Sequence, residues 1–317
     1  MTAFVFYLHL HMPLQKTLIT VVGPTAIGKT TLAIQLAQHF GTEIISADSR
    51  QFFKEMEIGT AKPNQQELAA ARHHFINSHS VTELFSTGDF EQQGLKVLAN
   101  IFTSHHQAIM VGGSGLYINA LINGLDEMPE IDLAIREKLN KQFENEGITA
   151  IQTQLAELDP AYFAKVDQNN PQRMIRGLEV FLSTGKRLSS MLTAQKKERP
   201  FNIIKIGLNR DRALLYDRIN KRVDEMERMG LVDEVKSLLP FRNYNALNTV
   251  GYSEIFDYID GKTSLADALS AIKQNTRRFA KRQLTWFRRD EEIKWFEPEE
   301  SGKVISFLEG EMSQHNP

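Results

Sequence analysis

The sequence has no cysteine, only two tryptophans and no long apolar run. The lack of cysteine excludes a disulfide framework and a zinc site with thiolate ligands, and it fits a reducing, cytoplasmic location. No apolar run approaches the roughly 18 residues that a membrane-spanning helix needs, so we expect no membrane partner. Acidic and basic residues almost cancel, leaving a formal net charge of −2. A nucleic-acid partner would therefore need a local basic patch.

The apolar opening, MTAFVFYLHLH, lacks the basic n-region and the small-residue cleavage site of a signal peptide. Met12 begins a natural lead into the first expected strand, so we interpret residues 1–11 as an alternative start or a disordered extension. The sequence assigns no role to residues 1–11 or 300–317.

Strand and helix patterns alternate over the first 125 residues. Within the helix expected at 89–102, Asp89 and Gln92 are placed like a capping box. Alternation of this kind predicts an α/β fold, a P-loop-type parallel sheet flanked by helices. The expected strands are 17–23, 42–49, 107–113, 201–208 and 292–296, and the expected early helices are 29–40, 64–74, 89–102 and 115–125.

Strand signals disappear from about residue 130 to 192, where amphipathic helices follow one another. One of these has Asn170 as its expected N-cap and Pro171 in its first turn. We therefore predict a helical insert domain at 130–192, set into a catalytic core made of residues 12–129 and 193–317.

The stretch GPTAIGKT follows a strand pattern and opens a helix pattern, the context in which a phosphate-binding loop is credible. Most such loops bind ATP or GTP. Backbone N–H groups and the helix N-terminus bind the anion, Lys29 adds a charge, and Thr30 can reach a bound Mg²⁺. The predicted diphosphate-binding residues are Gly23, Pro24, Thr25, Ala26, Ile27, Gly28, Lys29 and Thr30.

The acidic strand end of an ordinary P-loop NTPase is missing, because QAIMVGG runs into Ser114 instead. The strand that does end in an acid is TEIISAD, which places Asp48 at the carboxyl edge of the sheet, beside the phosphate loop. Two functional roles suit Asp48: a holder of Mg²⁺ and a general base. A plain turn cap before Ser49 is the structural alternative.

Basic residues occur at suggestive spacings in three places. Arg218 and Arg222 share a helix face and either clamp a diphosphate or form a solvated face. Gln172, Arg173 and Arg176 lie near the start of one helix. The stretch 273–289 holds seven basic residues, no acid and interleaved aromatics, which suits RNA but also a helix that covers the core with long stems.

In their order, these motifs resemble the tRNA dimethylallyltransferase (IPP transferase) family. The matching strings are GPTAIGKT, SADSRQFFKEMEIGTAKP, GGSGLYINALINGL, NPQRMIRGLEVFLSTGK, TVGYSEI and RRFAKRQLTWFRR, and the resemblance covers roughly residues 17–296. Small departures occur, since the family often has Tyr where Phe53 stands.

The resemblance implies a function for the loop. It would hold the diphosphate of dimethylallyl diphosphate, and the prenyl group would pass to N6 of the adenosine adjacent to the anticodon in tRNA, with Mg²⁺ as cofactor. Asp48, Ser114 and Arg222 would be catalytic. The implied tRNA-binding residues are Asp48, Ser49, Arg50, Gln51, Ser114, Arg136, Gln172, Arg173, Met174, Ile175, Arg176, Arg277, Arg278 and Arg282.

Three rival functions stay open. A free-nucleotide (adenylate) isopentenyltransferase shares the loop and the chemistry but should not need the basic stretch. A small-molecule P-loop kinase is usually nearer 200 residues. A non-catalytic RNA-binding protein would not need Lys29, Thr30 and Asp48 intact. We expect a monomer, and the sequence does not say which tRNAs are modified.

Overall fold

The computed structural model describes residues 15–193 and 195–314, so the interpretation of residues 1–11 lies outside the described residues. Contacts divide the chain into two compact units. Unit 1 takes in the described residues up to Ile122 and from Arg199 onward, and unit 2 is Asn123–Glu198. Among the described residues, no helix is both long and apolar enough to cross a membrane.

The centre of unit 1 is a parallel sheet, which within the described residues has six strands in the order β3-β2-β4-β1-β5-β6. Val21 in β1 lies opposite Val111 in β4 and Ile206 in β5. The predicted fold class, a P-loop-type parallel sheet flanked by helices, is confirmed. The strands are β1 (Thr17–Val22), β2 (Ile44–Ser46), β3 (His73–His74), β4 (Gln107–Gly112), β5 (Asn202–Leu208) and β6 (Lys294–Phe296).

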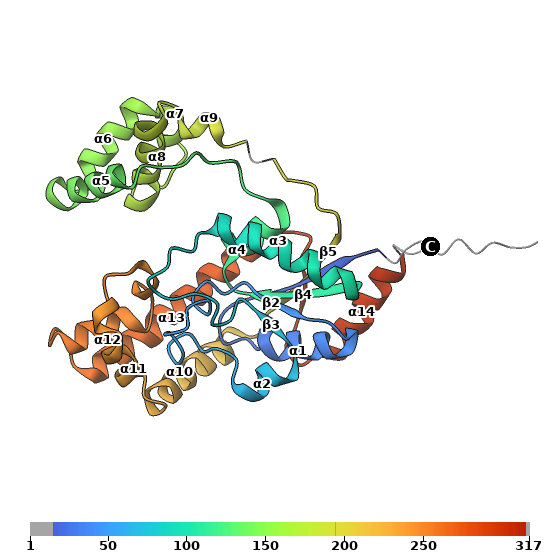
Figure 1. The fold of residues 1–317 in the computed structure, drawn as a ribbon. Coiled ribbons are helices and arrows are strands. Elements are labelled where there is room, and N and C mark those ends of the chain that lie inside the picture. The colour runs from blue at the N-terminus through green and yellow to red at the C-terminus, as the bar shows by residue number, and fades with distance from the viewer. Residues whose placement is uncertain (1–14, 194, 315–317) are drawn as a thin grey trace, which may run out of the picture. The chain divides into compact units, whose positions relative to one another are not determined.

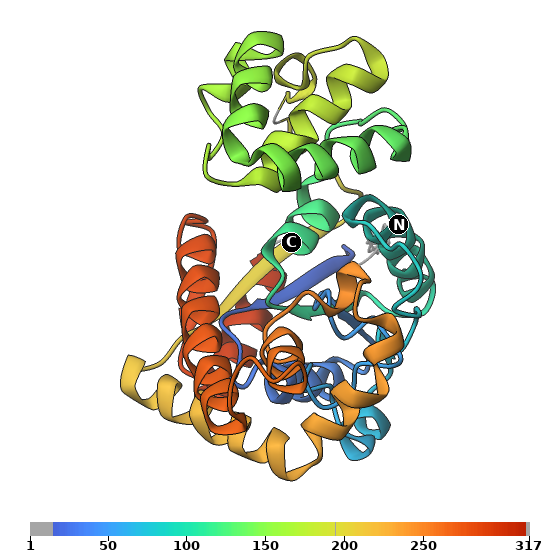
Figure 2. The ribbon, with the colours of Figure 1, turned by 90° about the vertical axis from the view of Figure 1, so that its left-hand side faces the viewer.

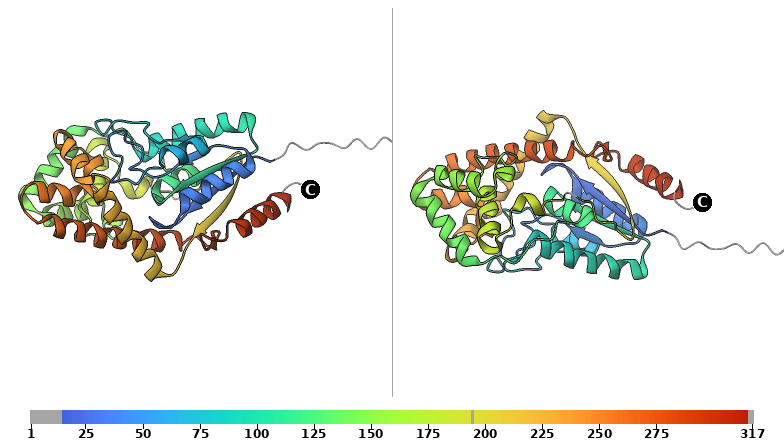
Figure 3. Two further views of the ribbon diagram at one scale, coloured as in Figure 1. Left: turned by 90° about the horizontal axis from the view of Figure 1, so that it is seen from below. Right: turned by 90° about the horizontal axis from the view of Figure 1, so that it is seen from above.

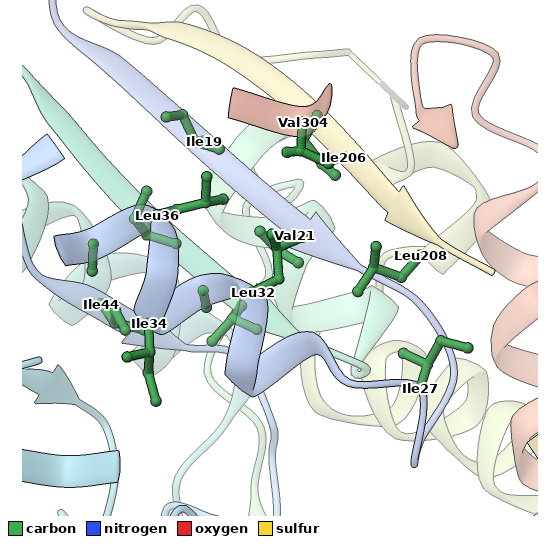
Figure 4. Close-up of a cluster of buried hydrophobic side chains, with 14 of the residues drawn as sticks. Ile19, Val21, Ile27, Leu32, Ile34, Leu36, Ile44, Ile206, Leu208 and Val304 are labelled. Atoms are coloured by element: carbon green, nitrogen blue, oxygen red, sulfur yellow. The ribbon is translucent and has the colours of Figure 1, made fainter. Parts of the chain in front are cut away.

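Helices cover both faces of this sheet (Figures 1 and 3). Alternate residues of a strand point to opposite faces, and in β1 both sets are buried under helices. Ile19 and Val21 pack with α1 (Lys29–Phe40) and α14 (Ser301–Gln314), as Figure 4 shows for Leu32, Leu36 and Val304. Leu18 and Val22 pack on the other side with α3 (Thr87–Ser104) and α4 (Gly115–Asn123). The two layers fix the strand ends from which the candidate site is built.

A further group of helices gathers at the end toward which the strands point (Figure 2). Its core includes Met56, Tyr252 and Ile255, which join a loop after β2 to the helices. The helices are α10 (Arg212–Arg228), α11 (Leu231–Ser237), α12 (Tyr252–Ile259) and α13 (Leu265–Phe287).

Unit 2 is helical and has its own core around Leu139, Ile151 and Leu178. It extends beyond the predicted insert 130–192, because its two connecting segments bond to each other: Lys197 N donates to Asn123 O at 2.7 Å. Its helices are α5 (Leu133–Glu146), α6 (Ile148–Leu158), α7 (Pro160–Phe163), α8 (Pro171–Thr184) and α9 (Leu188–Met191).

Two local predictions were wrong. The helix expected at 64–74 ends earlier, since α2 spans Gln65–Ala70 and His73–His74 form β3. The capping box of α3 also begins three residues before the predicted one. Ser86 accepts a hydrogen bond from the backbone N–H of Asp89, whose carboxylate accepts one from the N–H of Ser86. The earlier cap is preferred because a serine hydroxyl and an acid three residues later satisfy two helix-end N–H groups.

Candidate active site

The phosphate loop connects β1 to α1 through backbone conformations that favour glycine. Gly23 has φ 148°, and a Cβ atom there would lie 2.7 Å from the carbonyl oxygen of Leu208. Gly28 (φ 112°) and Ala26 (φ 63°) complete the turn. Lys29 Nζ donates a hydrogen bond of 2.8 Å to the carbonyl oxygen of Pro24, folding the side chain back over the loop.

A cavity of about 500 Å³ lies over this loop. Lys29, Thr30, Asp48, Arg218 and Arg222 all line it, so residues from the β1–α1 loop, the segment after β2 and α10 meet in one place. Four carboxylates, those of Asp48, Glu57, Glu67 and Glu225, line the same cavity and equal in number the cations Lys29, Lys62, Arg218 and Arg222. The case for an anionic ligand therefore rests on the loop itself, where Lys29 lies at the N-terminus of α1.

Burial lowers the pKa of Lys29 to about 8, and of its neighbours Asp48 raises this pKa while Arg222 lowers it. Burial also lowers the pKa of Arg222, and Arg218 acts in the same direction. Burial makes the charged forms of Lys29 and Arg222 less favourable. An anion that binds between the two side chains offsets this desolvation cost.

Asp48 lies two residues after the end of β2, whereas the expected strand 42–49 included it. One carboxylate oxygen accepts a hydrogen bond of 3.1 Å from the backbone N–H of Arg50, which is the turn-capping role. The residue also lines the cavity, which keeps the base and metal-holding roles available to the other carboxylate oxygen.

A second cavity, of about 450 Å³, adjoins the first. Leu116, Phe279 and Trp286 give it an apolar and aromatic wall, and the two rings are 38% and 42% exposed. Such a wall suits a flat heterocycle. The two cavities share Thr25, Asp48, Thr60, Ala61, Arg222 and Met226.

The residues predicted for the acceptor side make hydrogen bonds within the protein. Ser114 Oγ accepts from the N–H of Ser49 at 3.0 Å and donates to Ser49 Oγ at 3.2 Å, so its hydrogen bond goes to Ser49. Gln51 Nε2 donates to the carbonyl oxygen of Ala61 at 3.2 Å. Arg50 reaches the carbonyl oxygen of Asn245 at 3.2 Å. These bonds fix the shape of the loop after Asp48.

In unit 2 the predicted residues divide by burial. Gln172 and Arg173 are exposed, whereas Met174 and Ile175 are buried in the core of the unit, so the side chains of this pair do not face an RNA. Two arginines share one buried carboxylate, that of Glu179. Arg136 Nε lies 2.6 Å from it and Arg176 Nη1 lies 3.1 Å from it, joining α5 to α8.

The basic side chains on different faces of α13 have different surroundings. Arg277 donates to Asn220 Oδ1 at 2.6 Å and packs over the ring of Tyr216, so it joins α13 to α10. Other basic side chains are exposed and line, with Trp286, a surface hollow of about 480 Å³. The basic residues of this hollow are Arg278, Lys281, Arg282 and Arg289.

Two residues of the site make contacts that the sequence analysis does not predict. Gln283 on α13 bonds the N–H of Thr25 at 2.8 Å and the carbonyl oxygen of Gly113 at 2.9 Å. Glu234 on α11 accepts from the N–H groups of Ile58 and Gly59 at 2.6 and 3.0 Å. Gln283 lies within the matching string RRFAKRQLTWFRR, but no local pattern indicates the contacts of either side chain, because the partners are far away in the sequence.

Comparison with known proteins supplies the family. The sequence model of the IPP transferase family matches residues 51–290. The tRNA dimethylallyltransferase of Christiangramia forsetii is 56% identical over 297 residues, which cover 93% of this chain and 98% of that protein. The tRNA dimethylallyltransferase 1 of Bacteroides thetaiotaomicron is 45% identical over 301 residues, covering 95% and 98%.

Comparison with solved structures indicates the same family. The tRNA isopentenylpyrophosphate transferase of Bacillus halodurans superposes with a TM-score of 0.71 at 35% identity, covering 95% of this chain and 98% of that one. A eukaryotic dimethylallyltransferase, solved acting on tRNA, gives a TM-score of 0.69 at 28% identity, covering 86% and 70%. The resemblance seen in the motifs is confirmed, and the chain belongs to the IPP transferase family.

Proposed function

We propose that this enzyme transfers a dimethylallyl group from dimethylallyl diphosphate to N6 of the adenosine adjacent to the anticodon in tRNA, releasing diphosphate. One observation carries the proposal: a cavity over a phosphate loop, lined by Lys29 and Arg222, and an aromatic cavity meet at Asp48 and Arg222. An allylic diphosphate and an adenine placed in these cavities would meet at the same two residues.

The donor's diphosphate belongs in the first cavity, on the loop Gly23–Thr30. As the allylic C–O bond breaks, negative charge grows on the departing diphosphate. Lys29 and Arg222 are fixed cations at this place, so they stabilise the transition state more than the ground state. The backbone N–H of Thr25 is already bonded to Gln283, which leaves its hydroxyl for the ligand.

Mg²⁺ fits the oxygen atoms that the site presents. In the described part of the chain, no group of three or more His, Cys, Asp or Glu residues could hold a metal. Mg²⁺ commonly uses one or two protein oxygens together with substrate phosphates and water. The Thr30 hydroxyl and the Asp48 carboxylate would hold it, and when bound it would neutralise charge on the diphosphate.

The acceptor belongs in the second cavity, where Phe279 and Trp286 offer faces for stacking. An exocyclic adenine amine is a weak nucleophile because its lone pair is delocalised into the ring. Its nitrogen forms a bond to the allylic carbon as the C–O bond breaks, and we assign the proton it loses to the Asp48 carboxylate. The base must first leave its stack, at a cost of a few kcal/mol.

A tRNA acceptor is favoured over a free adenine nucleotide by the exposed arginines of α13. Arg278 and Arg282 lie beside Trp286, which borders both the second cavity and the basic hollow. The phosphates of a tRNA would contact these arginines, whereas binding of a free nucleotide would not need them. Arg136, Arg173 and Arg176 of unit 2 would add phosphate contacts. We also propose that the enzyme acts as a cytoplasmic monomer.

The test is transfer of label from dimethylallyl diphosphate. The enzyme is incubated with Mg²⁺ and, in turn, an unmodified tRNA, the same tRNA with guanosine at the target position, AMP, and no acceptor. We expect label only on the unmodified tRNA. Labelling of AMP at a comparable rate would support the adenylate isopentenyltransferase instead, and transfer to neither acceptor would refute the proposed function.

A further inference from the structure

Gln283 lies on the buried face of α13 and is only 6% exposed. It stands between two loops that come from different strands, the phosphate loop after β1 and the glycine turn after β4. A polar side chain so buried is stabilised only if both ends of its amide are bonded.

Both ends of the amide are bonded, each to a different loop. Gln283 Oε1 accepts a hydrogen bond of 2.8 Å from the backbone N–H of Thr25. Gln283 Nε2 donates one of 2.9 Å to the carbonyl oxygen of Gly113. A single side chain therefore fixes the distance between the two loops.

The fit around this amide is close. A Cβ atom on Gly113 would lie 2.2 Å from Gln283 Nε2 and 3.7 Å from the carbonyl oxygen of Gly23. Glycine at position 113 thus lets the turn approach both the amide and the phosphate loop. Any larger residue would push the loops apart or expel the amide.

Each loop leads directly to one side of the reaction. The phosphate loop carries Lys29 and Thr30, on the donor side. The residue after Gly113 is Ser114, whose hydroxyl bonds Ser49, and Ser49 follows Asp48. Hydrogen bonds and adjacent residues of the chain thus connect Gln283 to the diphosphate site in one direction and to the proposed general base, Asp48, in the other.

We propose that Gln283 is a positioning residue that sets the separation of the donor and acceptor sites. This inference rests on the proposed function. Bond formation requires the amine nitrogen and the allylic carbon to approach in line, and a misplacement of about 1 Å can cost about 100-fold in rate. Without Gln283 each loop keeps its own binding groups while the separation of the two loops changes, so the loss should appear in the chemical step.

The first variant is Gln283→Leu, which keeps the volume and removes both hydrogen bonds. With saturating dimethylallyl diphosphate and anticodon stem-loop RNA, we expect the single-turnover rate to fall about 10- to 100-fold. The dissociation constants of both substrates should change by less than about threefold, since their own contacts remain. Gln35→Leu is the matched control, because Gln35 is exposed on α1, and its rate should equal that of wild type.

The second variant, Gln283→Glu, gives a readout that a purely structural role would not move. A carboxylate can still accept from the N–H of Thr25 but cannot donate to the carbonyl oxygen of Gly113 until it is protonated. The ratio of variant to wild-type rate should therefore rise, by about threefold or more, as the pH is lowered. Dividing by the wild-type rate removes titration of the cavity's other charged groups, Asp48, Arg50, Arg222 and Arg282.

Three results would overturn the inference: a folded Gln283→Leu enzyme with a near wild-type single-turnover rate, an equal loss of rate and of either substrate's affinity, or a pH-independent ratio for Gln283→Glu. If Gln283→Leu does not fold, Gly113→Ala tests the same contact from its other side and should slow the same step. An inactive wild-type enzyme would instead refute the proposed function, so the two failures are distinguishable.

Discussion

Arg218 Nε donates a hydrogen bond of 2.9 Å to the carbonyl oxygen of Ala26. Ala26 is the residue of the phosphate loop whose φ of 63° is unusual for a side chain with a Cβ. The bond holds the loop against α10. Arg222, one turn later on the same helix, makes no hydrogen bond within the described chain and lines both cavities. The two arginines that looked equivalent in the sequence thus have different surroundings.

Arg222→Ala should lower the rate of transfer more than it weakens donor binding. Its charge lies where negative charge develops on the departing diphosphate, and removing such a group costs about 100-fold. Arg218→Ala should instead weaken donor binding and lower the melting temperature, because the loop loses its support. Single-turnover rates, donor binding and thermal unfolding measure the difference. Identical behaviour of the two variants would contradict this assignment.

The pKa of Lys29 near 8 predicts proton uptake on donor binding. A bound diphosphate favours the charged lysine, so the pKa in the complex is higher than in the free enzyme. Affinity should therefore be greatest below about pH 8 and fall as the pH rises from there toward the pKa of the complex. Asp48→Asn should move the start of this fall to lower pH, and Arg222→Gln to higher pH, because these neighbours act in opposite directions. Calorimetry in buffers of different ionisation enthalpy counts the protons, and a pH-independent affinity would exclude the linkage.

Asp48→Asn should reduce turnover steeply while RNA binding stays close to that of wild type. The substitution preserves shape and the oxygen that caps the turn to Arg50 but removes basicity. Turnover is measured over a Mg²⁺ series, with RNA binding as the control. If excess Mg²⁺ restored turnover, Asp48 would be a metal holder and the proton would go elsewhere.

Glu234→Gln should destabilise the loop that lines the donor cavity. One carboxylate oxygen accepts from the N–H groups of Glu57 and Ile58, and the other accepts from Gly59 and from the hydroxyl of Tyr252. An amide offers one oxygen and turns its NH₂ toward donors, so we expect a loss of about 2–4 kcal/mol in the free energy of unfolding.

Asp233→Asn is the matched control, since Asp233 is exposed on the same helix. Its free energy of unfolding, measured with denaturant, should stay within about 0.5 kcal/mol of wild type. Equal stability of the two variants would show that Glu234 is not the support of this loop.

The sequence predicts the sheet because each long strand carries its own apolar run and each early helix its own spacing. It misses β3, because a two-residue strand has no period and His73–His74 directly continue a helical pattern. Asp48 and Lys29 are predictable for the same local reason: a motif or a strand end carries them. The contacts of Gln283 are not predictable in this way, although the residue lies within a matching string, because its partner Thr25 is 258 residues away.

Burial separates the predicted RNA-binding residues into exposed and buried ones, a distinction that their spacing in the sequence does not give. Arg173 and Met174 are neighbours in the sequence, yet one is exposed and the other has no exposed surface. On α13, a count of charges does not separate Arg277, which bonds to α10, from Arg278, which faces solvent. The distinction depends on which neighbouring helix packs on each face, and a single sequence does not contain that information.

That distinction gives a matched test of how a nearly neutral protein binds RNA. Arg278 and Arg282 are exposed, whereas Arg277 bonds Asn220 and packs on Tyr216. The double variant Arg278→Ala/Arg282→Ala should weaken tRNA binding and flatten its salt dependence. The slope should change by about 0.7 to 0.9 for each phosphate that the variant no longer neutralises, because fewer counterions are released.

Arg277→Ala should lower the melting temperature and leave the salt slope unchanged. RNA binding across a salt series measures both, with donor affinity as a control that neither variant should alter. Prenylation at saturating tRNA should largely recover in the double variant, since these arginines position the RNA and do no chemistry. An unchanged slope in a folded double variant would show that the exposed face of α13 does not touch RNA phosphates.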